Sequence, residues 1–243
     1  MTIAIILAGG LGTRLRSVVP DLPKPMALVN GKPFLEHQIH YWHDQGIDEF
    51  VLSVGYKKEI IMDYFGASYK GIKISYAEEY SPLGTGGGLL LAFDLIGKDS
   101  GPVVVLNGDT YFEVNLPRML AFHAEKNSTW SFGLFRSNEA GRYMGMDVDK
   151  EGKVIGLKSG SREIGCLANG GVYIVNPDFV DVLEYEMGEK LSLEDDILNA
   201  LLTNNVSIYG CEIDGAFIDI GVPSDYQRAS FILASERGED AES

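Results

Sequence analysis

The sequence predicts an α/β protein with a Rossmann-like, three-layer α/β/α fold, built on a mixed, mostly parallel sheet with a β-rich insertion. In the first half of the 243-residue chain, short β-rich runs alternate with segments whose apolar residues recur at helical spacing. This alternation is typical of βαβ units and a parallel sheet. After residue 130 the runs become mostly β-rich, which indicates the insertion. The length fits one large domain or two small ones, and we interpret the pattern as a single domain over residues 1–235.

The first half contains predicted strands separated by predicted helices. The expected strands are residues 3–8, 50–54, 72–77 and 103–109. A helix is expected to open at Pro33 and end at Gly46, because proline is favoured in a first helical turn and glycine after the last. Further helices are expected from about Lys57 to Phe65 and after the glycine cluster 86–88.

The second half is expected to be richer in strands. The expected strands are residues 129–135, 145–157 and 169–175, the middle one a hairpin that turns at 149–152. Ser192, with Asp195 three residues later, resembles a capping box and predicts the start of a helix. Another helix is expected to begin at Pro223, and the strongly polar residues 236–243 are expected to form a disordered tail.

The charge distribution argues against nucleic acid and favours a small anionic partner. The chain carries a formal net charge of −15, whereas binding a phosphate backbone requires a basic face. Residues 1–32 are the exception, because they hold four basic residues against the single acid Asp21. One basic island in an acidic protein suits a small polyanion better than a polymer.

Cysteine content and the N-terminal sequence indicate a soluble, cytoplasmic protein. Cys166 and Cys211 have no metal-type spacing, which favours a reducing compartment over a disulfide scaffold or a zinc site. The first apolar run stops at Ala8 and is preceded by no basic residue. Such a run is too short for a signal peptide or a membrane span, so we expect no membrane partner.

Residues 7–26, LAGGLGTRLRSVVPDLPKPM, follow the first predicted strand and have the character of an anion site. A Walker A pattern occurs nowhere in the chain, and the dinucleotide fingerprint lacks its third glycine, where Leu15 stands. Glycines without a Cβ allow backbone amides to approach a phosphate. The Arg14 guanidinium suits bidentate phosphate contacts, and Lys24 presents a point charge on a stiff segment between two prolines.

Two aspartates end apolar strands and are candidate metal ligands. Asp109 follows VVVLNG, and Asp219 follows AFI; open α/β sheets bind ligands at such carboxyl ends. A pair of carboxylates together with phosphate oxygens suits Mg²⁺, although either aspartate alone could be a capping residue. The D-x-D pair Asp147 and Asp149 is expected to face solvent, because it lies on a hairpin strand and at its turn.

The loop GGLGTRL, followed after a spacer by PKP, resembles the signature of the sugar-phosphate nucleotidyltransferase family. SPLGTGGGL at 81–89 is similar to the family's P-L-G-T-[AG]-G loop, which cups the nucleotide base. NGGVYIV at 169–175 is similar to its N-[AG]-G-x-Y segment, which touches the sugar. The resemblance extends from Ile3 to about Tyr226. It implies a nucleotide-binding part over about 1–130 and a sugar-binding part over about 131–235.

The resemblance also implies roles for individual residues. Arg14 and Lys24 are expected to be catalytic, and Asp109 and Asp219 to hold Mg²⁺. The expected nucleotide contacts are Leu7, Ala8, Gly9, Gly10, Gly12, Thr13, Arg14, Gly84, Thr85, Gly86, Gly87, Asn107 and Gly108. The expected sugar-phosphate contacts are Lys24, Lys158, Asn169 and Gly170. Lys158 stands in for the lysine of a family E-K pair whose glutamate this sequence lacks.

The implied reaction is a single in-line displacement that needs no general base. The phosphate of a sugar 1-phosphate attacks the α-phosphorus of a nucleoside triphosphate and releases pyrophosphate. Catalysis then depends on positioning and electrostatics. The sequence offers no obvious catalytic histidine, because the four histidines fall in predicted helical segments. These are His37, His40, His43 and His123.

The spacer variant LRSVVPDLPKPMA, together with NGKPFLE and LNGDTYF, resembles the guanylyltransferase subgroup of this family. This resemblance implies GTP and D-glycero-α-D-manno-heptose 1-phosphate as substrates, used in bacterial surface-polysaccharide synthesis. Two alternatives remain open at this point. One is a mannose- or glucose-1-phosphate nucleotidyltransferase that uses GTP, dTTP or UTP. The other is a non-catalytic, nucleotide-sugar-binding regulatory protein. The sequence also leaves open a homo-oligomer, because the apolar helix after Pro223 could pack internally or across a dimer.

Overall fold

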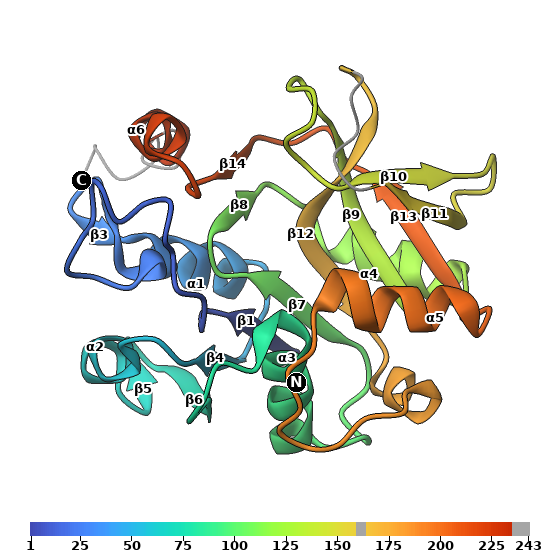
Figure 1. Ribbon diagram of the computed structural model, residues 1–243, viewed down its shortest axis with the longest axis horizontal. Helices are drawn as coiled ribbons and strands as arrows, with labels where there is room; N and C mark the ends of the chain where they lie inside the picture. The colour runs from blue at the N-terminus through green and yellow to red at the C-terminus, as the bar shows by residue number, and fades with distance from the viewer. Residues whose placement is uncertain (159–163, 235–243) are drawn as a thin grey trace.

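The computed structural model describes residues 1–158 and 164–234, with the side chain of Lys158 outside the description (Figure 1). Its main element is a ten-stranded mixed sheet with the path β11-β10-β12-β7-β1-β4-β6-β5, to which β9 adds beside β12 and β13 beside β9. The strands are β1 (Ile3–Leu7), β4 (Glu49–Val54), β5 (Ser68–Tyr69), β6 (Ile72–Glu78), β7 (Val103–Asn107), β9 (Trp130–Arg136), β10 (Gly145–Val148), β11 (Val154–Lys158), β12 (Leu167–Val175) and β13 (Ile208–Glu212).

Helices cover both faces of this sheet and complete the three layers that the sequence predicts. The helices are α1 (Phe34–Asp44), α2 (Lys58–Phe65), α3 (Gly84–Ile96), α4 (Leu116–Glu125), α5 (Asn199–Thr203) and α6 (Pro223–Ile232). Alternate residues of β1 enter two different cores: Ile6 joins the core shared with α1, α2 and α4, whereas Ile5 joins the core shared with α3 and α5. A strand buried on both faces in this way is typical of parallel α/β sheets.

The β-rich half continues the sheet. Strands β7, β1, β4 and β6 pair in parallel, and β12 then pairs antiparallel to β7, with Tyr173 opposite Val105. The predicted fold class is therefore confirmed, and the sheet is parallel at its centre and mixed beyond β7. The predicted hairpin is also present as β10 and β11, and the Asp149 carboxylate accepts the amides of Glu151 and Lys153 in the turn.

The helix predicted after Ser192 begins with a π-helical segment, Leu193–Leu198, before α5. The Ser192 hydroxyl accepts the amide of Asp195 at 3.1 Å, as a capping residue should. The reciprocal bond differs from the prediction, because the Ser192 amide donates to the carboxylate of Asp196, at 2.7 Å, and not to that of Asp195. The wider turn of a π-helix accounts for the shift by one residue.

Two small sheets and two short 3₁₀ segments complete the fold. The sheets pair β2 (Leu28–Val29) with β3 (Lys32–Pro33), and β8 (Thr110–Phe112) with β14 (Phe217–Asp219). The 3₁₀ segments are η1 (Lys24–Met26) and η2 (Pro177–Val182).

Helix α6 packs on the body of the molecule beyond β14 (Figure 1). It begins at Pro223 as predicted and buries Ala229 and, just after its end, Leu233 against a small core that includes Tyr111. The opposite side of the helix exposes 81% of Phe231. The predicted tail, 236–243, lies outside the described residues. Over the described residues, none of the helices is both long enough and apolar enough to span a membrane.

Candidate active site

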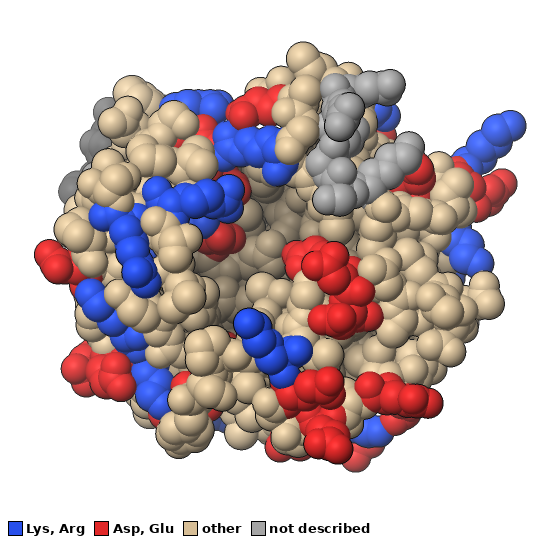
Figure 2. All heavy atoms as spheres, viewed as in Figure 1, with Lys and Arg blue, Asp and Glu red and all other residues tan. Residues whose placement is uncertain are grey.

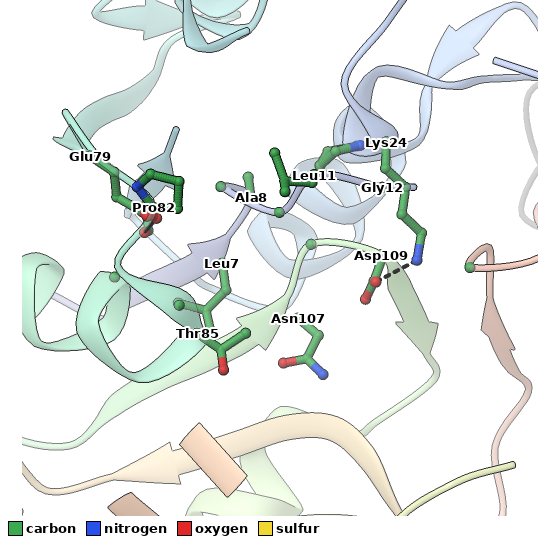
Figure 3. A pocket seen from close by; sticks show the side chains of 18 of the residues that line it. Leu7, Ala8, Leu11, Gly12, Lys24, Glu79, Pro82, Thr85, Asn107 and Asp109 are labelled. Atoms are coloured by element: carbon green, nitrogen blue, oxygen red, sulfur yellow. Dashed lines mark hydrogen bonds and ion pairs between the residues drawn. The ribbon is translucent and has the colours of Figure 1, made fainter. Parts of the chain in front are cut away.

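A pocket of about 510 Å³ opens at the carboxyl ends of β1 and β7 (Figure 3). The corresponding face is hollowed, with Lys and Arg side chains along the left of the hollow and Asp and Glu side chains along its right (Figure 2). The predicted site residues that line the pocket are Leu7, Ala8, Gly9, Gly10, Gly12, Thr13, Arg14, Lys24, Gly84, Thr85, Asn107, Gly108 and Asp109. The glycine loop, the loop before α3 and the turn after β7 therefore meet around one cavity, at the place where open α/β sheets bind ligands.

Two glycines permit the close backbone approaches that shape this pocket. Gly12 adopts a φ of +58°, and a Cβ added to it would lie 2.9 Å from the Cβ of Lys24. A Cβ added to Gly108 would lie 2.6 Å from the carbonyl oxygen of Leu7. The first glycine lets the loop cross Lys24, and the second lets the turn after β7 pass against the end of β1.

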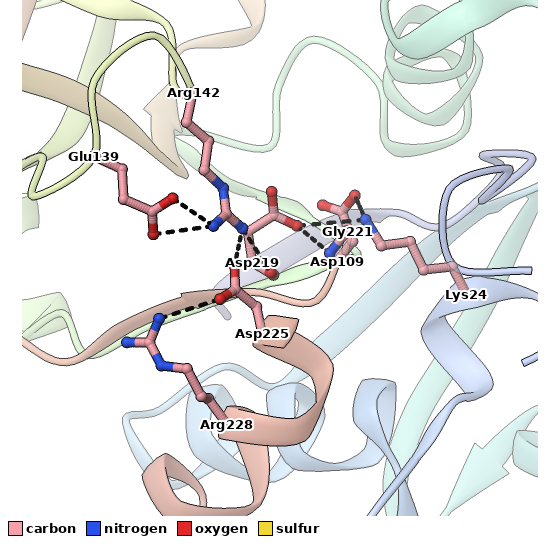
Figure 4. A network of polar contacts seen from close by, with 8 residues as sticks. All are labelled: Lys24, Asp109, Glu139, Arg142, Asp219, Gly221, Asp225 and Arg228. Atoms are coloured by element: carbon pink, nitrogen blue, oxygen red, sulfur yellow. Dashed lines mark hydrogen bonds and ion pairs between the residues drawn. The ribbon is translucent and has the colours of Figure 1, made fainter. Parts of the chain in front are cut away.

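The Lys24 ammonium joins the two predicted metal ligands (Figure 4). Its Nζ lies 2.5 Å from Oδ2 of Asp109 and 3.4 Å from Oδ1 of Asp219. Lys24 is 9% exposed and begins η1, between two prolines. Proline fixes the backbone on both sides, so the backbone that carries this amine is held in place beside the two carboxylates.

Strand pairing brings Asp109 and Asp219 together from distant parts of the chain. Asp219 ends β14 and lies opposite Thr110 of β8, the residue after Asp109. The amide of Ile220 continues this ladder by donating to the carbonyl of Asp109 at 2.9 Å. The Gly221 amide donates to Oδ1 of Asp219 at 2.6 Å and orients its carboxylate.

The donor set at this point fits a divalent metal that is completed by substrate oxygens. Two carboxylates converge, and the Lys24 ammonium already acts as a stand-in cation between them. The described residues contain no cluster of three or more His, Cys, Asp or Glu side chains able to hold a metal on their own. Mg²⁺ is often held by one or two carboxylates together with substrate phosphates, so the pair matches that mode of binding.

Glu79 also lines the pocket, and the sequence patterns did not predict it. Its carboxylate accepts the amide of Leu83 at 2.9 Å and lies 3.4 Å from the Ser53 hydroxyl. Burial raises the pKa of this carboxyl above its usual value. A Cβ added to Gly88 would lie 2.9 Å from Oε1, so the glycine leaves the carboxylate its space. The sequence feature that could have indicated Glu79 is its position directly after the strand β6.

Lys190 and Glu194 also line the pocket and were not predicted. Lys190 lies just before the π-helical segment and Glu194 lies within it, and this region docks on the start of α3. The Thr85 hydroxyl accepts the amide of Leu193 at 3.0 Å. The Gly86 amide donates to the Leu191 carbonyl at 2.9 Å.

Gly86 and Gly87 are not among the residues that line the pocket, and their expected nucleotide contacts stay predictions. An added Cβ would lie 2.9 Å from the Ser192 carbonyl carbon at Gly86, and 2.6 Å from the Glu189 carbonyl oxygen at Gly87. Both glycines therefore let α3 pack against this segment, and the pocket wall is formed by Gly84, Thr85 and Gly88 instead.

Two of the predicted sugar contacts, Asn169 and Gly170, lie in β12 and are not among the residues that line the pocket. The side-chain Nδ2 of Asn169 donates to the hydroxyl of Tyr173 at 2.8 Å, and its Oδ1 accepts the backbone amide of Gly171 at 3.0 Å. A Cβ added to Gly170 would lie 2.5 Å from the Phe112 ring, so the absence of a side chain lets Phe112 pack against it; its sugar contact stays a prediction. The side chain of Lys158 lies outside the described residues.

The histidines are occupied elsewhere, as expected. His37 contacts the Val29 carbonyl, His43 the Ile47 carbonyl, and His123 lies between Ser131 and Asn176. His40 lies within 3.5 Å of Glu36 on the surface of α1.

Comparisons with known proteins agree with this geometry. Residues 3–236 match the model of the nucleotidyl transferase family. The chain is 44% identical, over 93% of its length and 96% of the relative's, to D-glycero-alpha-D-manno-heptose 1-phosphate guanylyltransferase of Aneurinibacillus thermoaerophilus. It is 39% identical, over 92% of its length and 96% of the relative's, to the enzyme of the same name from Campylobacter jejuni.

A solved structure shows the same fold. HddC from Yersinia pseudotuberculosis complexed with GMP-PN has a TM-score of 0.82 and 32% identity, with 95% of this chain and 99% of that chain covered. The chain therefore belongs to the nucleotidyl transferase family. The resemblance to sugar-phosphate nucleotidyltransferases, drawn from the loop motifs, is confirmed.

Substituting Gly12 should destabilise the protein, and substituting Gly10 should not. Gly12→Ala forces an alanine into a left-handed conformation and against Lys24, which should lower the free energy of unfolding by about 1–3 kcal/mol. Gly10→Ala is the matched control, because nothing lies within 4 Å of its added Cβ. Urea denaturation measures both. Equal stability of the two variants would contradict the tight crossing over Lys24.

Proposed function

We propose that the protein transfers a guanylyl group from GTP to D-glycero-α-D-manno-heptose 1-phosphate, with release of pyrophosphate. A nucleoside triphosphate and a sugar 1-phosphate are the substrates that fit the family. The heptose and the guanine are supported by the names of the two relatives. The observation in this chain that carries the choice of base is the carboxylate of Glu79 in the pocket wall.

A carboxylate suits guanine because of the hydrogen-bonding pattern of this base. Guanine presents two adjacent donors, the N1–H and the N2 amino group, and an ionised carboxylate offers two acceptors. Adenine and cytosine lack this pair of donors. Glu79 is held by the Leu83 amide and the Ser53 hydroxyl, so its orientation is set before a base enters. A buried acceptor left without a donor also penalises the wrong base.

The residues around Lys24 suit the transfer step. An oxygen of the sugar phosphate attacks the α-phosphorus, the bond to the bridging oxygen breaks, and the electron pair leaves with pyrophosphate. The attacking phosphate is already anionic near neutral pH, so no side chain must take its proton. The exposed Arg14 at the pocket rim neutralises the triphosphate, and Lys24 guides the attacking phosphate.

A divalent metal generally takes part in nucleotidyl transfer in this family. Asp109 and Asp219 would hold Mg²⁺, which supplies neutralisation of phosphate charge when it is bound. This arrangement favours an enzyme over a non-catalytic regulatory protein, because a protein that only binds a nucleotide sugar has no need for two converging carboxylates and a lysine.

Glu79→Gln should lose guanine selectivity without losing stability. The amide offers one acceptor and one donor, so we expect kcat/KM for GTP to fall about 10–100-fold, as for the loss of a hydrogen bond to a charged group. ITP, which lacks the N2 amino group, should lose much less. An unchanged ratio of GTP to ITP efficiency, measured by pyrophosphate release, would rule out this base contact.

The pH dependence of Tm and of KM for GTP provides a control for Glu79→Gln. Because burial raises the pKa of Glu79, the ionised form opposes folding above that pKa, and Glu79→Gln should leave Tm at pH 8 unchanged or higher. Protonation removes an acceptor, so KM for GTP in the unmodified protein should rise as the pH falls through that pKa. This rise should be absent in the variant.

Asp109→Asn should slow turnover about 100-fold or more, by analogy with the loss of one electrostatic group from an active site. It removes a charge that faces both Lys24 and the expected metal. Asp94→Asn, on the exposed side of α3, is a matched control and should retain normal turnover. Near-normal turnover in purified Asp109→Asn would remove Asp109 from the proposed mechanism.

A further inference from the structure

Arg142 reaches from the loop between β9 and β10 to the residues that carry Asp219 (Figure 4). Its Nη1 donates to both carboxylate oxygens of Glu139, at 3.1 and 3.0 Å. Its Nη2 points the other way, lies 3.4 Å from the main-chain carbonyl of Asp219 and pairs with the carboxylate of Asp225. One guanidinium therefore joins the β-rich half to β14 and α6.

Asp225 depends on this contact because its side chain is only 3% exposed. It lies in the first turn of α6, where a carboxylate interacts favourably with the helix dipole. Its other cationic partner, Arg228, lies at 3.1 Å but is itself 56% exposed, whereas Arg142 is 18% exposed. Burying a carboxylate is costly without a well-placed partner, so Arg142 is the stronger of the two.

The turn from Asp219 to α6 is braced at both of its ends by the same side chain. At one end Arg142 donates to the Asp219 carbonyl, and at the other it pairs with Asp225. Within the turn, the Gly221 amide holds Oδ1 of Asp219 at 2.6 Å. A shift of this turn would move the Gly221 amide and rotate the Asp219 carboxylate away from Asp109 and Lys24.

We propose that Arg142 is a positioning residue that holds Asp219 in place as a metal ligand. It touches neither carboxylate of the Asp109–Asp219 pair and acts through the backbone of the turn. Lysine cannot replace it, because the contacts to Glu139, Asp219 and Asp225 require a planar group with several donors. The proposal rests on the proposed function to the extent that Asp219 binds the metal.

Direct Mn²⁺ binding tests the proposal without relying on turnover. Free Mn²⁺ is followed by electron paramagnetic resonance while the full-length protein is titrated. We expect Arg142→Met to weaken Mn²⁺ binding about tenfold and Arg142→Lys to recover less than half of that loss. Arg228→Met, which removes the exposed partner of the same Asp225, is the matched control and should stay within twofold of the unmodified protein.

A double variant separates positioning from simple stabilisation. Arg142→Met leaves Asp225 buried beside a single exposed partner and should lower Tm. Adding Asp225→Asn removes that buried charge, so Tm should recover while Mn²⁺ binding stays weak. Recovery of Mn²⁺ binding together with Tm would show that Arg142 only neutralises Asp225, and would overturn the proposal.

Asp219→Asn distinguishes failure of this proposal from failure of the proposed function. If Asp219→Asn weakens Mn²⁺ binding and Arg142→Met does not, the positioning role of Arg142 is wrong and the metal role of Asp219 stands. If Asp219→Asn leaves Mn²⁺ binding unchanged, Asp219 is not a metal ligand and both proposals lose their basis.

Discussion

The Lys24 ammonium lies between the carboxylates of Asp109 and Asp219, and much of the surrounding structure serves to hold these three groups together. Two carboxylates repel each other unless a cation lies between them. The prolines on either side of Lys24, the glycine at position 12 and the pairing of β8 with β14 each hold one part of this arrangement. In the proposed reaction, these groups would neutralise the charge of the substrate phosphates together with the metal.

The pocket divides the chemistry between two regions of the chain. The loops after β1, β6 and β7 surround a nucleotide-sized cavity, with Glu79 at one wall and Asp109 at another. The β-rich half joins the same sheet through β12 and β7, so one continuous sheet connects both halves. Arg142 adds a polar connection between the halves at the level of Asp219. In our proposal, metal binding and the β9–β10 loop are therefore mechanically linked.

The parts of the site that could be predicted follow directly from local sequence. Gly12, Lys24 and Asp109 belong to short motifs that come after strands β1 and β7, and the carboxyl ends of neighbouring parallel strands meet at one edge. Asp219 was placed at a strand end for the same reason. Its contact with Lys24 depends on the pairing of β14 with β8, which no local pattern specifies.

The parts that could not be predicted depend on tertiary packing. Glu79 and Glu194 lie in segments without a motif, and only the docking of residues 190–194 on α3 brings the latter to the pocket. Gly86 shows that a recognised sequence motif can also leave the neighbour of a residue undetermined. A glycine-rich run indicates a close approach, but its sequence does not show which segment approaches; in the structure the backbone of Ser192 lies close to Gly86.

The most direct test of the proposed activity is Mg²⁺-dependent pyrophosphate release by the purified protein. ATP, GTP, CTP, UTP and dTTP would each be paired with the 1-phosphates of D-glycero-α-D-manno-heptose, mannose, glucose and N-acetylglucosamine. We predict release with GTP and the heptose 1-phosphate, and its loss when EDTA removes the metal. Nucleotide binding without pyrophosphate release in any pairing would contradict the assignment of this site to nucleotidyl transfer.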